Sequence, residues 1–299
     1  MIDDTSGVDE FEALRRYLGS VAYRLLGSVS DAEDILQEAW LRWRATDRSR
    51  VEEPRAFLTT VVTRLCYDQL GSARSRREAY YGEWLPEPVV SEDASPAHLA
   101  ELGEEVSLAL LTVLEQLTPA ERTAFVLHDV FSIGFDEIAG SLDRTPDATR
   151  QLASRARRRM KNGGRRTSVD RAAHREVVSA FASAATRGDI QGLVALLDPD
   201  VVWHSDGGGI VSAGVRPIEG ADKVSRLVTG LFAKYVVPEP GVGWAPVLVN
   251  GVPGMAWHDA AGTVFGVVVF ELADGRITEA HVVVNPEKLT HVTRITVTP

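Results

Sequence analysis

The sequence predicts three domains: two all-α domains, of which the second carries a helix-turn-helix, and a C-terminal α+β domain. The chain has 299 residues, which is more than one typical domain needs. Apolar residues recur at helical spacing from about residue 10 to 160, whereas runs of β-branched residues dominate from Val201 onward. Stretches rich in proline, glycine and polar residues, at about 80–101 and 162–169, separate these regions.

The composition is typical of a globular protein, with 44% hydrophobic and 25% charged residues and a net charge of −10. The single cysteine, Cys66, excludes an internal disulfide framework and suits a reducing cytoplasm. The start of the chain is acidic, and no run of about twenty apolar residues occurs, so we expect no signal peptide and no membrane span. The seven histidines lack metal-ligand spacing, and we expect no metal and no cofactor.

The first helical region contains "SDAEDILQEAWLRW", where Ser30 and Glu33 match a capping box. Its apolar stripe comprises Ala32, Ile35, Leu36, Ala39 and Trp43, and places Asp34, Glu38 and Leu41 on other faces. Pro54 begins a second helix, whose predicted core face is Phe57, Val61 and Leu65, with Leu58 and Val62 beside it. That helix ends in a basic cluster, Arg74, Arg76 and Arg77.

A sharp charge inversion marks the second helical region. Residues 83–121 hold nine acids and no Lys or Arg, whereas residues 144–166 hold nine Lys or Arg and one Asp. Within the basic part, Thr145 reads as an N-cap and Pro146 as the first helical residue. Ala148, Leu152, Ala156 and Met160 then form an apolar face, with Thr149, Arg150, Ser154, Arg155 and Arg158 largely off it. This pattern predicts a helix-turn-helix that binds DNA, although a solvated basic helix end is the alternative.

The C-terminal region begins with an amphipathic helix that Gly188 ends. Strand-like runs follow, and Asp274-Gly275 between two of them is a hairpin signal. One helix, "GADKVSRLVTGLFAKY", interrupts the strands. We therefore expect helices that cover a curved antiparallel sheet.

These pieces, in this order, resemble an extracytoplasmic-function (ECF) sigma factor of bacterial RNA polymerase with a C-terminal SnoaL-like, nuclear-transport-factor-2-like domain. "DAEDILQEAWLRW" resembles the region 2 helix that docks on polymerase, and "PRAFLTTVVTRLCYDQLGSARSRR" the helix that reads the minus-ten element. "LTPAERTAFVLHDVFSIGFDEIAGSLDRTPDATRQLASRARRRM" resembles region 4, which reads the minus-thirty-five element. The resemblance implies region 2 at 8–80, a linker at 81–103, region 4 at 104–163 and the SnoaL-like domain at 170–295.

The resemblance also implies site residues. Polymerase contacts fall on Asp34, Gln37, Glu38 and Leu41; DNA contacts fall on Arg64, Asp68, Arg74, Arg76, Arg77, Thr149, Arg150, Ser154, Arg155 and Arg158. Many members of the family carry Asn where Arg64 stands. Core RNA polymerase and promoter DNA are the implied partners, with no separate anti-sigma factor required.

Three short motifs place the chain with the subgroup that carries a SnoaL-like extension. They are a linker motif (Trp84-Leu85-Pro86-Glu87-Pro88), a glycine motif (Asp206-Gly207-Gly208-Gly209) and a C-terminal motif (Asn285-Pro286-Glu287-Lys288-Leu289). We expect these loop-type sequences to form a docking surface through which the C-terminal domain regulates the sigma domains in cis. The interdomain set is Trp84, Leu85, Pro86, Asp206, Gly207, Gly208, Asn285, Pro286, Lys288 and Leu289.

Two other classes of function stay open at this point. SnoaL-like folds include cyclases and isomerases, and the candidate polar pocket residues here are Trp203, His204, Asp206, His258, His281 and Asn285. No motif specifies a nucleophile, so we expect no catalytic residues and no enzyme activity, while a small-molecule ligand in the SnoaL-like pocket stays open. A ligand-sensing repressor that binds duplex DNA without polymerase is the second rival.

Overall fold

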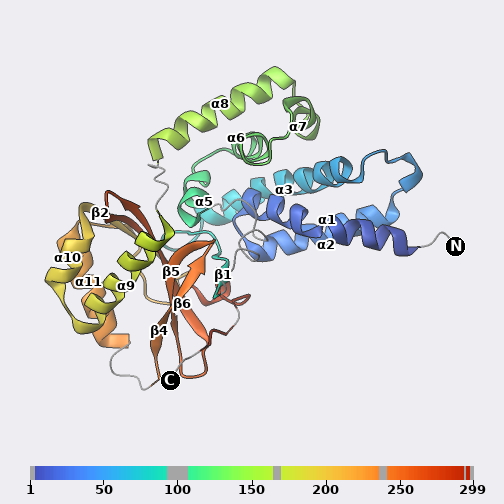
Figure 1. The fold of residues 1–299 in the computed structure, drawn as a ribbon. Coiled ribbons are helices and arrows are strands. Elements are labelled where there is room, and N and C mark those ends of the chain that lie inside the picture. Colours follow the sequence, from blue (N-terminus) through green and yellow to red (C-terminus); the bar gives the residue numbers. More distant parts are fainter. Residues whose placement is uncertain (1–3, 93–106, 164–169, 236–240, 293, 297–299) are drawn as a thin grey trace. The chain divides into compact units, whose positions relative to one another are not determined.

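The computed structural model describes residues 4–92, 107–163, 170–235, 241–292 and 294–296, without the side chains of 4–6, 72–78 and 161–163. The chain divides into two compact units. Unit 1 comprises Met1–Ala79 and Leu111–Gly164, and unit 2 comprises Tyr80–Leu110 and Arg165–Pro299. Figure 1 shows the helices of unit 1 and the sheet with its helices in unit 2. No helix in the described ranges has both the length and the apolar character needed to cross a membrane.

Unit 1 is all-helical. Its elements are α1 (Asp4–Leu26), α2 (Val29–Ala45), η1 (Arg48–Arg50), α3 (Pro54–Glu78), α6 (Pro119–Phe125), the π-helical η2 (Val126–Val130), α7 (Phe135–Ser141) and α8 (Pro146–Gly163), and α5 (Leu108–Leu114) spans the boundary between the units. The predicted stripe of α2 is confirmed, since Ala32, Ile35, Leu36, Ala39 and Trp43 are all buried. The N-cap is Ser28 and not Ser30: the Ser28 hydroxyl accepts the Asp31 N–H at 3.0 Å.

The buried face of α3 lies one residue later than the sequence predicted. Leu58, Val62 and Cys66 are fully buried, whereas the predicted face of Phe57, Val61 and Leu65 is half-buried. Burial raises the pKa of the Cys66 thiol, which therefore behaves as a packed apolar group.

The helix-turn-helix forms as the sequence predicts. Asp143 adopts the left-handed conformation, with φ of 51°, and turns the chain between α7 and α8. The Thr145 hydroxyl then accepts the Ala148 N–H at 3.2 Å, as an N-cap does. The sharp turn and the cap together fix where α8 begins.

Within unit 1, the helices α1 to α3 pack against the helices α6 to α8. Arg122 on α6 is 2% exposed, and its guanidinium donates to Glu115 and, at 3.4 Å, to the Arg24 carbonyl of α1. The Arg64 guanidinium on α3 donates to the Gly140 carbonyl of α7 at 2.9 Å. The buried guanidinium of Arg122 is tolerated because it is paired with Glu115 and hydrogen-bonded to the Arg24 carbonyl.

Unit 2 has an α+β fold. Its helices are α9 (Arg171–Arg187), α10 (Ile190–Leu196), α11 (Ala221–Tyr235) and the short η3 (Pro286–Lys288). Its strands are β1 (Val90–Ser91), β2 (Leu197–Asp206), β3 (Ile218–Glu219), β4 (Gly243–Val249), β5 (Val252–His258), β6 (Val264–Ala273) and β7 (Arg276–Val283). Gly188 ends α9 in the left-handed conformation, as predicted.

Within the described ranges, seven strands form one sheet in the order β1-β4-β5-β6-β7-β2-β3. The predicted hairpin at Asp274-Gly275 joins β6 to β7, and both residues have the positive φ that such a turn requires. The expectation of an antiparallel sheet is wrong at one place, because β2 pairs with β7 in parallel. The sheet is therefore mixed.

The two faces of this sheet carry different cores. Against the helices, the packed residues include Phe181, Trp203, Phe232, Met255 and Phe270. The opposite face carries a second apolar cluster, which includes Leu85, Leu108, Val267, Val283 and Leu289. Leu85 belongs to the predicted linker, so part of the linker is built into the core of unit 2.

Candidate functional site

The linker segment (residues 80–92) is held on unit 2 by a buried lysine, Lys288. The Lys288 ammonium lies 2.7 Å from Oδ2 of Asp206 and donates to the Leu85 carbonyl. It also lies over two aromatic rings, 3.9 Å from the Trp84 centroid and 5.0 Å from the Tyr80 centroid. A cation removed from water needs such compensation by charge, hydrogen bonds and π faces. We call these five residues the linker clamp.

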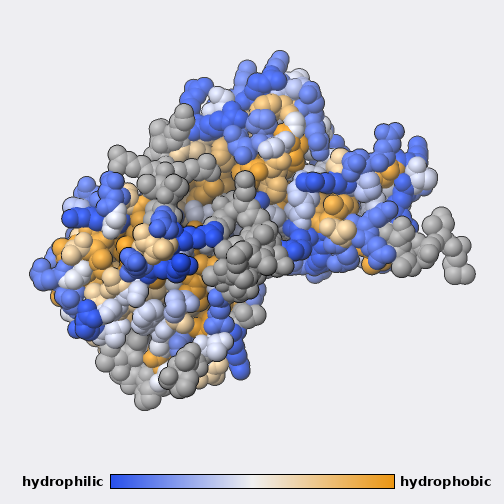
Figure 2. Space-filling view, in the orientation of Figure 1, coloured by the Kyte–Doolittle hydropathy of each residue, from blue (hydrophilic) through white to orange (hydrophobic). Residues whose placement is uncertain are grey.

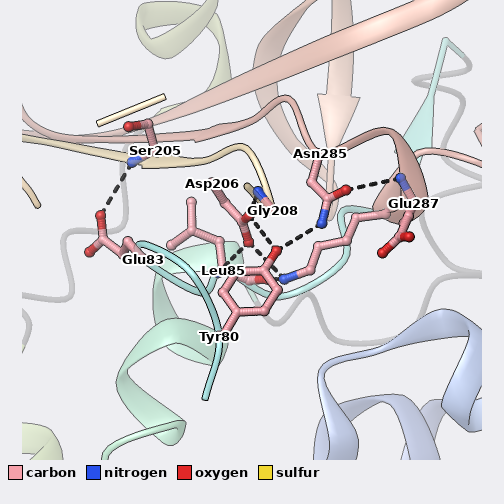
Figure 3. A network of polar contacts seen from close by, with 9 residues as sticks. Tyr80, Glu83, Leu85, Ser205, Asp206, Gly208, Asn285 and Glu287 are labelled. Atoms are coloured by element: carbon pink, nitrogen blue, oxygen red, sulfur yellow. Dashed lines mark hydrogen bonds and ion pairs between the residues drawn. The ribbon is translucent and has the colours of Figure 1, made fainter. Parts of the chain in front are cut away.

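Asp206 is the anion at the centre of the linker clamp (Figure 3). It is fully buried at the end of β2, and its carboxylate also accepts the Leu85 N–H at 2.8 Å and the Tyr80 hydroxyl at 2.7 Å. A further hydrogen bond comes from the Gly208 N–H at 3.0 Å. Burial, followed by the Asp206 hydrogen bond and charge, raises the pKa of Tyr80, which keeps this hydroxyl protonated as a donor.

Asn285 connects the C-terminal motif to the same place. Its Nδ2 donates to the Tyr80 hydroxyl at 2.8 Å, and its Oδ1 accepts the Glu287 N–H at 3.0 Å. The second bond caps η3, the turn that carries Lys288. Gly208 has φ of 64°, and a Cβ there would lie 2.4 Å from Asn285 Nδ2. Glycine is therefore required for the glycine motif to approach the C-terminal motif.

The linker segment makes further contacts on both sides of the clamp. Glu83 accepts hydrogen bonds from the Ser205 N–H at 3.2 Å and pairs with His204 Nδ1 at 2.6 Å. The N–H of Val89 donates to Asn250 Oδ1 at 3.1 Å, and the Val89 carbonyl accepts the Asn250 N–H at 2.7 Å. Beyond it, β1 pairs antiparallel with β4 at the edge of the sheet.

The structure thus brings the three predicted motifs together. Six of the ten predicted interdomain residues meet in or beside the clamp: Trp84, Leu85, Asp206, Gly208, Asn285 and Lys288. Pro86 and Gly207 are buried next to it, and Leu289 lies in the second core. Pro286 is exposed at the start of η3. Sequence reasoning missed Tyr80, Glu83 and Asn250 as partners in this set. Glu83 directly precedes the linker motif and Tyr80 lies shortly before it, so their position beside that motif could have indicated their part in the contacts.

The six candidate pocket residues do not line one pocket. Trp203 packs among the apolar residues under the helices, whereas His204, Asp206 and Asn285 bond to the linker segment on the opposite face. His281 is buried and stacks on His204 with ring centroids 4.9 Å apart, and burial lowers the pKa of His281. His258 is also buried, at the end of β5.

An open depression of about 470 Å³ lies elsewhere on unit 2. Its lining includes Leu197, Glu219, Asp222, Lys223 and Arg276. None of the predicted site residues belongs to this lining.

On α2, the four predicted polymerase-contact residues share the solvent-exposed side. Asp34, Gln37, Glu38 and Leu41 are all exposed, and Leu41 retains 55% of its surface. Glu38 forms an exposed ion pair with Arg42 at 2.9 Å.

On α8, one predicted DNA-contact residue is buried. Thr149 is fully buried, and its hydroxyl donates to the Thr145 carbonyl at 3.1 Å, so it packs inside the domain. Arg150, Arg155 and Arg158 are exposed and Ser154 is half-buried. Arg155 pairs with Glu121 at 3.2 Å, and Figure 2 shows hydrophilic residues along the outer side of α8.

On α3, Arg64 and Asp68 are exposed on the same side of the helix. The side chains of Arg74, Arg76 and Arg77 lie outside the described residues.

Comparison with known proteins identifies the families that these regions match. Residues 11–76 match the family model of Sigma-70 region 2, residues 107–160 that of Sigma-70 region 4, and residues 178–280 that of a SnoaL-like domain. The chain is 43% identical to the ECF RNA polymerase sigma factor SigJ of Mycobacterium tuberculosis over 95% of this chain and 93% of that protein. It is 34% identical to a probable ECF RNA polymerase sigma factor SigI of the same species, over 93% of each.

A solved structure agrees with this likeness. The crystal structure of Mycobacterium tuberculosis SigJ superposes with a TM-score of 0.78 and 40% identity, and covers 96% of this chain and 100% of that one. Region 2, region 4 and the SnoaL-like domain also follow one another here in the order that the sequence motifs predicted. The chain belongs to the ECF RNA polymerase sigma factors, in the group that carries a C-terminal SnoaL-like domain.

Proposed function

We propose that this protein binds core RNA polymerase, directs it to promoters with minus-ten and minus-thirty-five elements, and is regulated in cis by its SnoaL-like domain. Transcription initiation follows from the family; the regulation rests on one observation. The linker clamp joins residues 80–85, which lie between the two sigma regions, to Asp206, Asn285 and Lys288 of the SnoaL-like domain. The segment that connects region 2 to region 4 is therefore held by the domain that follows both.

The polymerase contact is assigned to the exposed side of α2. Asp34, Gln37, Glu38 and Leu41 are free of the buried stripe, so they are available to a partner without unfolding. Leu41 supplies apolar contact area and the acids supply charge complementarity and steering.

The DNA contacts are assigned to α8 and α3. Arg150, Ser154, Arg155 and Arg158 form the proposed major-groove surface, and Arg64 with Asp68 belongs to the proposed minus-ten surface. Thr149 is omitted because it is buried. In this structure Arg64 donates to Gly140 of region 4. Binding to the promoter must therefore replace that hydrogen bond.

Regulation in cis requires two arrangements of the linker that differ in activity. In the arrangement seen here, the clamp shortens the free chain between the sigma regions by fixing residues 80–92 on unit 2. Releasing the segment lengthens that free chain, which changes the distance over which regions 2 and 4 can separate.

A role as an enzyme is the less favoured alternative. The polar residues that were candidates for catalysis bond to the linker segment or lie buried, and the face under the helices is packed by apolar side chains. Catalysis needs acid and base groups beside a space for substrate. We therefore propose that the SnoaL-like domain acts by holding the linker, without a catalytic residue or a cofactor.

Co-purification with core polymerase tests the proposed function. A chain with Asp34→Lys and Glu38→Lys should lose core polymerase and keep its helicity, because both residues are exposed. The matched control carries Asp9→Lys and Glu12→Lys, the same charge change on exposed positions of α1, and should retain polymerase. Retention by both variants, or failure of the unaltered chain to bind, would argue against the assignment.

A further inference from the structure

The linker segment lies on unit 2 in the way that a bound peptide lies on its receptor. Its main chain is contacted at successive points: the Leu85 N–H by Asp206, the Leu85 carbonyl by Lys288, and both polar groups of Val89 by Asn250. The segment then adds β1 to the free edge of β4, with Val90 opposite Val249. Strand addition of this kind gives affinity through main-chain hydrogen bonds.

The surface of unit 2 that receives residues 80–92, which we call the groove, is contacted closely by two linker side chains. Leu85 is fully buried in the second core, among residues that include Val267, Val283 and Leu289. Two positions earlier, Glu83 places its carboxylate on His204 and on the Ser205 N–H. These contacts fit an acid followed, two residues later, by a leucine-sized apolar side chain.

The two prolines suit the segment to this groove. Pro86 and Pro88 have no N–H, so the stretch between Leu85 and Val89 leaves fewer donors to be satisfied. The carbonyl of Pro88 meets His291 Nε2 at 2.8 Å. Prolines also restrict the free segment to extended conformations, which lowers the entropy lost when it docks.

We propose that this groove is a peptide-recognition site that also takes an extended segment of a partner protein. The segment it takes has the chemistry of the linker: an acid, an aromatic residue, leucine, proline-acid-proline and a short β-strand. Such a segment displaces the linker by occupying the same contacts. The inference rests on the proposed control through the linker, since it names the class of partner that releases it.

The linker has the advantage of being tethered. A short flexible tether gives an effective concentration on the order of millimolar, so a free peptide competes poorly with an intact linker. Weakening the linker's own anchor offsets this advantage and changes no residue of the surface that receives the linker. Leu85→Ala does so, because Leu85 belongs to the linker, whereas Val267, Val283 and Leu289 of the same cluster belong to the SnoaL-like domain.

The test is binding of a labelled peptide with the sequence of residues 80–92 to the full-length chain, followed by fluorescence anisotropy. We expect the Leu85→Ala chain to bind this peptide at least about tenfold more tightly than the unaltered chain. A control peptide with Leu85→Ser has the same length and charge, and it should bind neither chain.

Release of the linker is measured separately, as cleavage by a glutamate-specific protease at Glu83 or Glu92. If the Leu85→Ala chain releases its linker but shows no saturable binding of the peptide, the peptide-recognition inference is overturned and the control in cis stands. If the linker of that chain stays protected, both proposals are overturned. Should Leu85→Ala reduce the folded population, a chain with Tyr80→Phe replaces it, because this change removes a linker hydrogen bond, keeps the packing and leaves the cleavage sites in place.

Discussion

The Lys288 ammonium and the Asp206 carboxylate form an ion pair of 2.7 Å in which both side chains are almost entirely buried. The pair joins the C-terminal motif to the glycine motif, and through Leu85 it joins both to the linker. A buried ion pair contributes little net stability, but removal of one partner leaves the other charge uncompensated. The pair is thus a point at which a small change has a large effect on the linker.

Replacement of Lys288 by methionine should release the linker segment. The change leaves the Asp206 carboxylate buried without its cation, which costs about 3–5 kcal/mol. We expect faster cleavage of residues 80–92 by a glutamate-specific protease and a lower denaturation midpoint for unit 2. Lys223→Met, at an exposed position of α11, is the matched control and should leave both measurements unchanged. Equal cleavage of the two variants would count against the clamp.

Replacement of Leu85 by alanine should destabilise unit 2 by about 2–5 kcal/mol, because it removes a fully buried side chain and leaves a cavity. Urea denaturation followed by tryptophan fluorescence measures this loss. Tyr81→Ala provides the control, since Tyr81 belongs to the same segment and is 67% exposed. A loss within about 0.5 kcal/mol for both variants would mean that Leu85 is not an anchor.

The free energy of unfolding should depend on pH through the ionisation of Glu271. Burial, and then the neighbouring Glu279 carboxylate, raise the pKa of Glu271 to about 7. A pKa raised in the folded state contributes stability that is present at low pH and is lost as the pH rises through about 7. Glu271→Gln should therefore reduce the loss of unfolding free energy between pH 5 and 8, and Glu176→Gln, at an exposed position, should not. Parallel pH profiles for the unaltered and Glu271→Gln chains would contradict this prediction.

Two arginines on α8 should contribute to promoter recognition. Arg150→Ala and Arg158→Ala should each weaken binding to a minus-thirty-five element by roughly 1–3 kcal/mol, as loss of a base or phosphate contact does. Electrophoretic mobility shift with the polymerase holoenzyme measures the effect. Thr149→Val, a buried change on the same helix, should alter stability and leave promoter preference unaltered. Unchanged binding by both arginine variants would show that another surface reads the element.

Local sequence signals predicted the elements that depend on local chemistry. The cap at Thr145 and the hairpin at Asp274-Gly275 are each set within a few residues, and each forms as predicted. The errors are small displacements, such as the cap of α2 at Ser28 and the buried face of α3, which lies one residue later than predicted. Helical periodicity fixes a stripe to within about one residue, and the partner helix decides which edge of the stripe is buried.

The linker clamp depends on contacts that no local signal contains. Tyr80 reaches Asn285 across 205 positions, and Leu85 reaches Asp206 across 121. The sequence indicated that the three motifs form a docking surface, because glycine and proline mark loops that permit close approach. It did not indicate that the linker itself adds a strand, since β1 has two residues and a two-residue strand has no periodicity. The parallel pairing of β2 with β7 was missed for a different reason, because the pairing of distant strands is set by tertiary packing.

In vitro transcription with purified core polymerase tests the central claim most directly. The comparison is between the unaltered chain, Lys288→Met, the Lys223→Met control and a chain that ends at Val284, each first confirmed as folded and polymerase-bound. If the SnoaL-like domain controls initiation through the linker, Lys288→Met and the shortened chain change promoter output in the same direction, several-fold, while Lys223→Met matches the unaltered chain. Equal output from all four chains, with the linker of Lys288→Met shown to be released, would contradict control in cis.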